Sequence, residues 1–152
     1  MTEENFWLMK SEPDAYSIDN LKNDGITLWD GIRNYQARNF MRNMKLGHQV
    51  YFYHSNCKPP GIVGLMEVIN LNIVDPTQFD KASKYFDPKS KPDNPRWDCV
   101  KVKYISKSNK MLSLPELKTL FSEDELLVVK KGNRLSILPI RNDVAKLLLE
   151  KI

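Results

Sequence analysis

Two histidines are the first residues to consider for catalysis in this sequence. His48 follows Gly47 at a turn, where we expect it to be exposed to solvent. His54 precedes Ser55, but neighbouring residues of a strand point to opposite faces, which argues against a direct relay between them. The sequence contains no G-x-S-x-G turn, phosphate loop, dinucleotide motif or H-E-x-x-H motif. We therefore predict no catalytic residue, although an enzyme of nucleotide or nucleic-acid metabolism that uses His54 with a carboxylate such as Asp30 stays open as an alternative.

The cysteines do not indicate a metal site. Cys57 and Cys99 are the only two, and they show no C-x-x-C spacing. A structural zinc ion needs about four ligands, usually cysteine and histidine, and His48 and His54 would have to join both cysteines by a coincidence of folding. We predict no metal, no cofactor and two reduced thiols.

The tryptophans suggest a binding site for a flat ring. Trp7 lies inside a short apolar run and is expected in the core, whereas Trp29 and Trp97 stand at element edges beside turn-forming residues. An indole at a strand end can wall a pocket, where stacking on a nucleobase contributes about 1–3 kcal/mol. The alternative is that each indole only covers the rim of the core.

Cations gather on one predicted helix, residues 33–45. Arg38, Arg42 and Lys45 fall on one stripe of that helix, and the whole chain carries a net charge of +4. Guanidinium groups pair with phosphate oxygens in a forked geometry, so the stripe could follow a nucleic-acid backbone. Two alternatives remain: a solvated helix face, and a small-molecule-binding adaptor domain whose basic face is incidental.

The remaining pattern predicts short strands with small helices between them. Strands are expected at residues 5–10, 26–29, 49–54, 62–74, 97–106 and 134–138, with a bulge or a close backbone approach at Gly64. Helices are expected at 17–22, 33–45, 113–121 and 142–151, residues 125–130 fit either type, and 75–95 form a long loop. This order predicts an α+β fold around a curved, mostly antiparallel sheet or small β-barrel of five or six strands.

The length of 152 residues fits one domain, 1–152. No apolar run approaches the roughly 18 residues of a membrane span, and the N-terminus is acidic where a secretory signal would be basic. We expect a monomer without membrane contact, located in the cytoplasm, or in the nucleus of a eukaryotic source.

Five sequence blocks, in this order, resemble the EVE-domain family over nearly the whole chain. They are FWLMKSEP at 6–13, WDGIRNYQARN at 29–39, VYFYHS at 50–55 with GIVG at 61–64, PKS at 88–90 with PRW at 95–97, and RLSILPI at 134–140. Ile32 and Leu138 are mild departures. The resemblance implies a PUA-like barrel, the fold class of YTH domains, which bind methylated adenine in RNA. It also implies a module that binds nucleic acid, DNA or RNA, and in some members a modified cytosine.

Joined to the resemblance, these residues predict a mechanism without catalysis. A flipped base, modified by a methyl or hydroxymethyl group, would enter between aromatic walls. The predicted base pocket consists of Trp29, Trp97, Tyr35, Lys10, Ser11, Asn34, His54, Ser55 and Asn56. The predicted phosphate contacts are Arg33, Arg38, Arg42 and Lys45, with the first amides of their helix.

Overall fold

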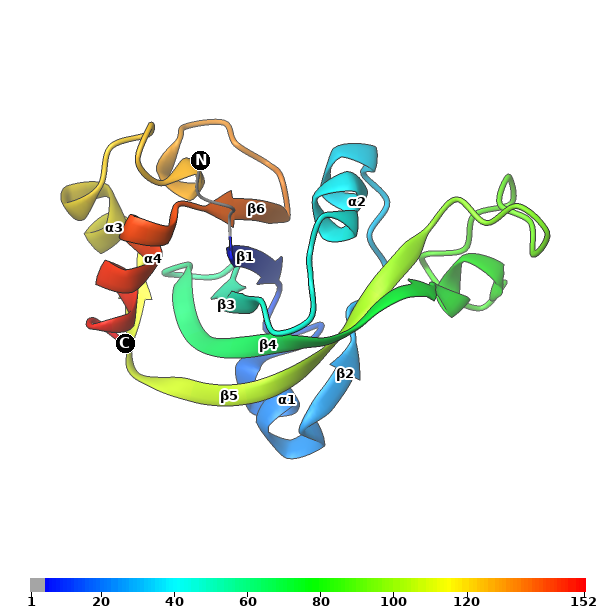
Figure 1. The fold of residues 1–152 in the computed structure, drawn as a ribbon, viewed down its shortest axis with the longest axis horizontal. Helices are drawn as coiled ribbons and strands as arrows, with labels where there is room; N and C mark the ends of the chain where they lie inside the picture. The colour runs from blue at the N-terminus through cyan, green and yellow to red at the C-terminus, as the bar shows by residue number, and fades with distance from the viewer. Residues whose placement is uncertain (1–4) are drawn as a thin grey trace.

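One curved six-stranded sheet organises residues 5–152, the part of the chain that the computed structural model describes (Figure 1). The strands lie side by side in the order β2-β5-β4-β3-β1-β6. Neighbouring strands are antiparallel except β1 and β3, which are parallel. Their bounds are β1 Phe6–Ser11, β2 Ile26–Leu28, β3 Gln49–His54, β4 Gly61–Val74, β5 Asp98–Ser113 and β6 Ile137–Ile140. The α+β prediction is confirmed, but closure into a barrel is not, because β2 and β6 pair on one side only among these strands.

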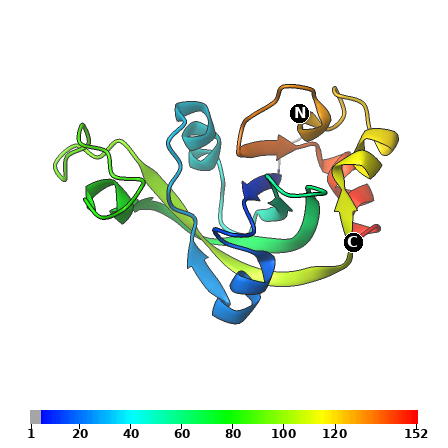
Figure 2. The same cartoon turned by 180° about the vertical axis from the view of Figure 1, so that it is seen from behind.

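Helices cover both faces of the sheet and create two cores (Figures 1 and 2). Their bounds are α1 Ile18–Asp24, α2 Tyr35–Arg42, α3 Leu114–Leu120 and α4 Asn142–Leu149, with short 3₁₀ helices η1 Pro76–Phe79 and η2 Leu127–Val129. Alternation along the strands separates the cores. Val50 and Phe52 of β3 pack with α1 and α2, while Tyr51 and Tyr53 pack with α3 and α4. Because both faces of β3 are buried, this strand is apolar and aromatic without a polar repeat.

Several element boundaries differ from the sequence-based prediction, and three of them have a clear physical reason. Helix α2 begins two residues later than expected because Asn34 caps it, its side chain accepting the Ala37 N–H at 2.9 Å. Strand β5 continues well beyond residue 106, since Leu112 still pairs with Ile62 of β4. Strand β6 starts at Ile137, opposite Met9 of β1. Long-range pairing, which local sequence does not contain, sets the latter two boundaries.

The predicted bulge at Gly64 is present, with register shifts on both sides of β4. A β-carbon there would lie 2.5 Å from Cδ1 of Ile18 and 2.7 Å from the carbonyl oxygen of Ser106. The glycine therefore allows α1 to pack directly against the sheet.

The expectation of an exposed His48 is wrong. Its side chain is buried, with Nδ1 accepting hydrogen bonds from Trp7 Nε1 at 3.1 Å and from the Lys45 backbone N–H at 3.2 Å. An indole N–H inside a core needs an acceptor, and His48 supplies it.

A buried hydroxyl ties the sheet to the last helix and gives a stability prediction. Tyr51 donates to the carbonyl oxygen of Ala145 at 2.6 Å. We expect Tyr51→Phe to lower the free energy of unfolding by about 1 kcal/mol, measured by urea denaturation. Tyr53→Phe is the matched control, since its hydroxyl makes no hydrogen bond within residues 5–152. Equal losses in the two variants would contradict the assignment.

His54 accepts a hydrogen bond at the start of α1, and from this contact we predict how stability depends on pH. His54 Nε2 accepts the Ile18 N–H at 3.1 Å, and burial lowers the pKa of His54. As the pH is lowered, His54 takes up a proton near pH 6.5 in the unfolded chain and at a lower pH in the folded protein. Stability is therefore intact above that pH and falls as the pH drops from about 6.5 through the folded pKa.

We expect His54→Asn, which lacks this titration, to approach the wild type in unfolding free energy as the pH is lowered from about 7.5 to 5.5. Chemical denaturation at each pH measures the difference. A gap that stays constant over this range would refute the role of His54.

Candidate functional site

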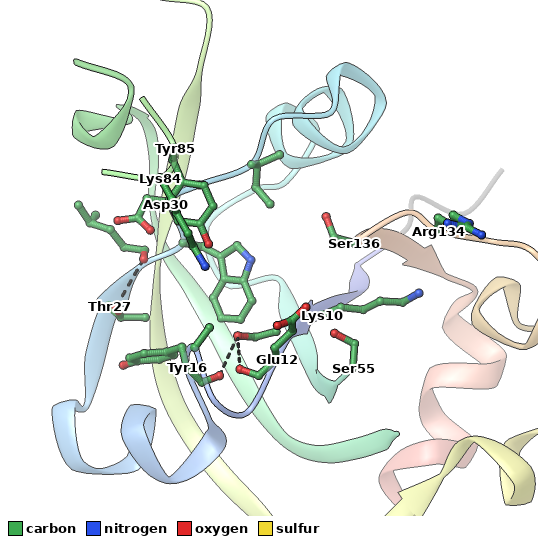
Figure 3. A pocket seen from close by; sticks show the side chains of 16 residues that line it. Lys10, Glu12, Tyr16, Thr27, Asp30, Ser55, Lys84, Tyr85, Arg134 and Ser136 are labelled. Atoms are coloured by element: carbon green, nitrogen blue, oxygen red, sulfur yellow. Dashed lines mark hydrogen bonds between the residues drawn. The ribbon is translucent and has the colours of Figure 1, made fainter. Parts of the chain in front are cut away.

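A cavity of about 750 Å³ opens where β1, the segment after β2 and the segment before β6 approach one another. Its volume is within the range of pockets that bind small molecules. Figure 3 shows Asp30, Lys84 and Tyr85 on one side and Lys10, Arg134 and Ser136 on the other. The lining residues are Lys10, Ser11, Glu12, Ala15, Tyr16, Thr27, Leu28, Trp29, Asp30, Gly31, Ile32, Ser55, Lys84, Tyr85, Arg134 and Ser136.

Trp29 is the indole of this cavity. Trp29 directly follows strand β2, and its backbone N–H donates to the carbonyl oxygen of Val100 at 2.8 Å. Its ring meets the ring of Phe52 edge to face, with centroids 5.3 Å apart and planes at 85°. The side chain is 6% exposed, so the core fixes it in place while it contributes to the cavity wall.

Tyr85 is a second aromatic lining residue, which the sequence analysis missed. A β-carbon on Gly31 would lie 2.8 Å from its ring, and Gly31 has a φ of +82°. Glycine is therefore required there both for the backbone and for the close approach of the tyrosine. The available signals were the Trp-Asp-Gly turn and the length of the 75–95 loop. Neither signal identifies which residue of the loop packs against the turn at Gly31.

The polar lining has both signs of charge. Lys10, Lys84 and Arg134 face the cavity together with Glu12 and Asp30. Burial lowers the pKa of Lys10 and raises the pKa of Asp30, for which the nearby Asp75 is a second, smaller cause. These charges can bind a ligand that presents both hydrogen-bond donors and acceptors.

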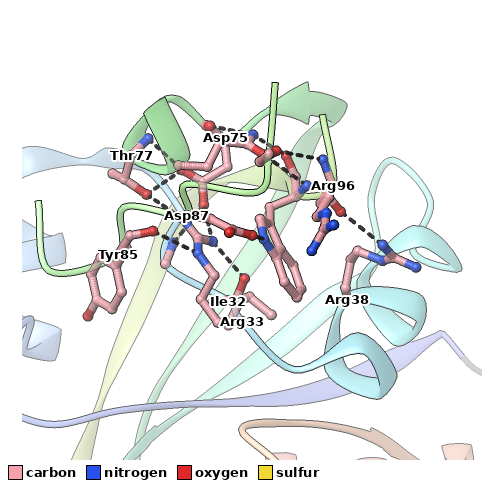
Figure 4. A network of polar contacts seen from close by, with 12 residues as sticks. Ile32, Arg33, Arg38, Asp75, Thr77, Tyr85, Asp87 and Arg96 are labelled. Carbon is pink, nitrogen blue, oxygen red and sulfur yellow. Dashed lines mark hydrogen bonds and ion pairs between the residues drawn. The ribbon is translucent and has the colours of Figure 1, made fainter. Parts of the chain in front are cut away.

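Arg33 holds the loop that carries Tyr85 (Figure 4). Its guanidinium donates to the carbonyl oxygen of Tyr85 at 2.9 Å, to Thr77 Oγ1 at 3.0 Å and to Asp75 Oδ2 at 3.0 Å. The Asp75 side chain is fully buried and also accepts the Gly31 N–H at 2.8 Å. Predicted as a phosphate contact, Arg33 instead uses its donors inside the protein.

Trp97 and Tyr35 do not line the cavity. The Trp97 side chain is buried, and its Nε1 donates to Asp87 Oδ2 at 2.7 Å, which lowers the pKa of Asp87. Gln78 fixes its backbone by accepting the Trp97 N–H at 3.1 Å and donating to its carbonyl oxygen at 2.6 Å. Tyr35 stacks on Trp97, with ring centroids 4.8 Å apart.

The other predicted pocket residues divide between cavity and framework. Lys10, Ser11 and Ser55 line the cavity with Trp29. Asn34 caps α2, His54 accepts a backbone N–H of α1, and Asn56 donates to Glu12 Oε1 at 3.3 Å. These last three lie outside the lining and support it.

The predicted phosphate track is not a row of available cations. Arg42 pairs with Asp98 at 3.0 Å, and Lys45 lies beside a second cavity of about 530 Å³ next to Trp7. Arg38 donates to Asn39 Oδ1 and to the carbonyl oxygen of Arg96, which are both neutral groups. Arg38 therefore retains a charge that no carboxylate in residues 5–152 contacts.

Within the described part of the chain, no group of three or more histidine, cysteine or acidic side chains is arranged to hold a metal ion. Cys57 and Cys99 are both free thiols, and burial raises the pKa of Cys99 to about 12. None of the helices between residues 5 and 152 is long and apolar enough to cross a bilayer.

Known proteins match this chain over most of its length. Human thymocyte nuclear protein 1 is 43% identical over 155 residues, covering 90% of this chain and 69% of that protein. The chain spans about half to two thirds of the length of the curated vertebrate relatives that it matches.

Solved structures match as well. A protein from Pseudomonas syringae superimposes with a TM-score of 0.91 and 39% identity, covering 97% of this chain and 99% of that one. The crystal structure of human THYN1 protein in complex with 5-methylcytosine-containing DNA superimposes with a TM-score of 0.88 and 41% identity, covering 95% of both chains. The family model of the EVE domain matches residues 5–151. The chain therefore belongs to the EVE-domain family.

Proposed function

We propose that this protein binds nucleic acid and holds one flipped, modified nucleobase in the Trp29 cavity, without catalysis. The observation that carries the proposal is the cavity itself, walled by an indole that the core holds in place. The similarity of this chain to a human protein crystallised with 5-methylcytosine-containing DNA supports cytosine as the base and a methyl group as the modification.

In this proposal Trp29 provides the stacking surface and Tyr85 the facing wall. A base that leaves its stack regains about 1–3 kcal/mol from such a surface. A methyl group would fill an apolar recess, which limits discrimination to about 1–3 kcal/mol. Flipping out of a duplex costs a few kcal/mol, so single-stranded or mismatched sites should bind more tightly.

The polar lining suits the edge of a cytosine. Carboxylate oxygens can accept a hydrogen bond from the exocyclic amino group of cytosine, and Glu12 and Asp30 both line the cavity. Ser11 Oγ already donates to the carbonyl oxygen of Tyr16 at 2.7 Å, so it is left to accept from a ligand. Lys10 can donate to the ring nitrogen or the carbonyl oxygen of the base.

Two observations support binding without turnover. The His54 Nε2 lone pair is used by the Ile18 N–H, so that nitrogen is not available as a general base while α1 stays capped. The charged groups that act on the pKa of His54 are Asp19 and Lys107, and Asp30 is not among them. The enzyme alternative, which pairs His54 with Asp30, is therefore disfavoured.

The names of the relatives also bear on the cellular location. The vertebrate relatives are named thymocyte nuclear protein 1, and we propose a nuclear location for this protein in a eukaryotic source.

Removing the indole tests the cavity. We expect Trp29→Ala to weaken binding of a single-stranded 5-methylcytosine oligonucleotide by about 5- to 150-fold, the equivalent of one stacked base. Trp29→Phe should lose less because it keeps an aromatic face. Fluorescence anisotropy measures both, and circular dichroism checks folding. If the wild type binds methylated and unmodified oligonucleotides equally and weakly, the proposal is wrong.

Salt titration separates phosphate contacts from framework residues. We expect Arg38→Gln to reduce the slope of log K against log salt by about 0.7 on single strands, because it removes one phosphate contact. The double variant Arg33→Gln/Asp75→Asn removes a buried pair together, which avoids an unpaired charge. It should weaken binding at every salt concentration and leave the slope unchanged. A reduced slope in the double variant would place Arg33 on phosphate.

A further inference from the structure

An exposed aromatic ring lies at the start of α2, outside the cavity lining. Tyr35 is the first residue of α2, and its side chain is 50% exposed. Its ring stacks on Trp97 with centroids 4.8 Å apart and planes at 22°. The capture of a base by Trp29 uses neither of these rings.

The face of Tyr35 that points away from Trp97 is open. The Arg38 guanidinium lies 4.7 Å from the Tyr35 centroid and 5.8 Å from the Trp97 centroid. A guanidinium on the outer face would be separated from Trp97 by the whole thickness of the stack. Arg38 is much closer to Trp97 than that, so it does not cover the outer face of Tyr35. The exposure of Tyr35 agrees with this position.

The open ring rests on a fixed support. Trp97 is buried and held at its indole nitrogen by Asp87 and along its backbone by Gln78, which is itself fully buried. A ring stacked on such a support loses little conformational freedom when a second flat group covers it. The surface is therefore organised before a ligand arrives.

The charge beside this ring suits a phosphate. The hydrogen bonds that the Arg38 side chain donates go to neutral oxygens of Asn39 and Arg96, so its positive charge is not offset by a contacting acidic group in the described residues. A nucleotide whose base covered Tyr35 would bring its phosphate toward this guanidinium.

The stack is connected to the cavity wall through one side chain. The Arg33 guanidinium lies 5.3 Å from the Trp97 centroid and 5.8 Å from the Tyr85 centroid, and Tyr85 lines the cavity. Along the chain, Tyr35 follows the lining residue Ile32 by three positions. A strand whose flipped base entered the cavity would pass close to this second ring.

We propose that the exposed face of Tyr35 stacks on a base that neighbours the flipped base in the same strand, with Arg38 contacting the phosphate of that nucleotide. This inference rests on the proposed function and extends the site from one base to a short stretch of strand. The protein then reads the modified base in the cavity and gains affinity from its neighbour without regard to sequence, because every base has a face that can stack.

The test compares an oligonucleotide with a single nucleoside. Tyr35→Ala should weaken binding of a single-stranded heptamer with a central 5-methylcytosine by about 5- to 150-fold. Tyr35→Phe, which keeps the ring, should bind as the wild type does. Binding of the free nucleoside 5-methyl-2′-deoxycytidine, measured by calorimetry at high protein concentration, should be the same in all three proteins.

An abasic site on one side of the 5-methylcytosine identifies the partner of Tyr35. Replacing the stacked base should weaken the wild type and have no effect on Tyr35→Ala. Equal heptamer affinity of Tyr35→Ala and wild type would overturn the inference, as would an equal loss of nucleoside binding. If the base pocket of the proposed function is wrong, the wild type will not prefer the methylated heptamer over an unmodified one. In that case, weaker binding of both heptamers by Tyr35→Ala would still support stacking on Tyr35.

Discussion

The ion pair between Arg33 and Asp75 is the contact on which the site depends. Asp75 is fully buried, and a buried carboxylate without a partner would cost several kcal/mol. The Arg33 guanidinium pairs with this carboxylate and also donates to Thr77 and to the carbonyl oxygen of Tyr85. Asp75 in turn accepts the N–H of Gly31, beside Trp29. One pair therefore fixes both the turn that delivers the indole and the loop that delivers the tyrosine, and the cavity lies between them.

The sheet explains why such a cavity can exist in a small protein. Helices cover both faces of the central strands, so the core is divided in two, and β2 lies at one edge of the sheet. The open edge leaves the segment after β2 to turn back over the ends of β1 and the segment before β6. A closed barrel would have used the same backbone groups for strand pairing. The absence of closure is thus linked to the position of the site.

The sequence predicted the elements better than the site. Strand β3 and the starts of α1 and α3 were evident because local composition determines them. Trp29 was placed correctly in the cavity lining because a tryptophan before Asp-Gly ends a strand at a turn. The pairing of Arg33 with Asp75 could not be predicted, since the two residues lie 42 positions apart. Nothing in a helical stripe of cations tells which of them a buried carboxylate has already engaged.

Trp97 illustrates the same limit from the aromatic side. At the start of a strand its indole could equally line a pocket or support one, and a contact with Asp87 ten residues earlier decides the outcome. Under the proposed function that outcome separates two tasks. Trp29 faces a cavity whose lining carries both signs of charge, which suits the polar edge of a heterocycle with hydrogen-bond donors and acceptors. Trp97 instead supports a ring beside Arg38, where a phosphate is favoured. The two aromatic sites together orient a strand: the base enters the cavity, and the backbone stays outside it beside Arg38.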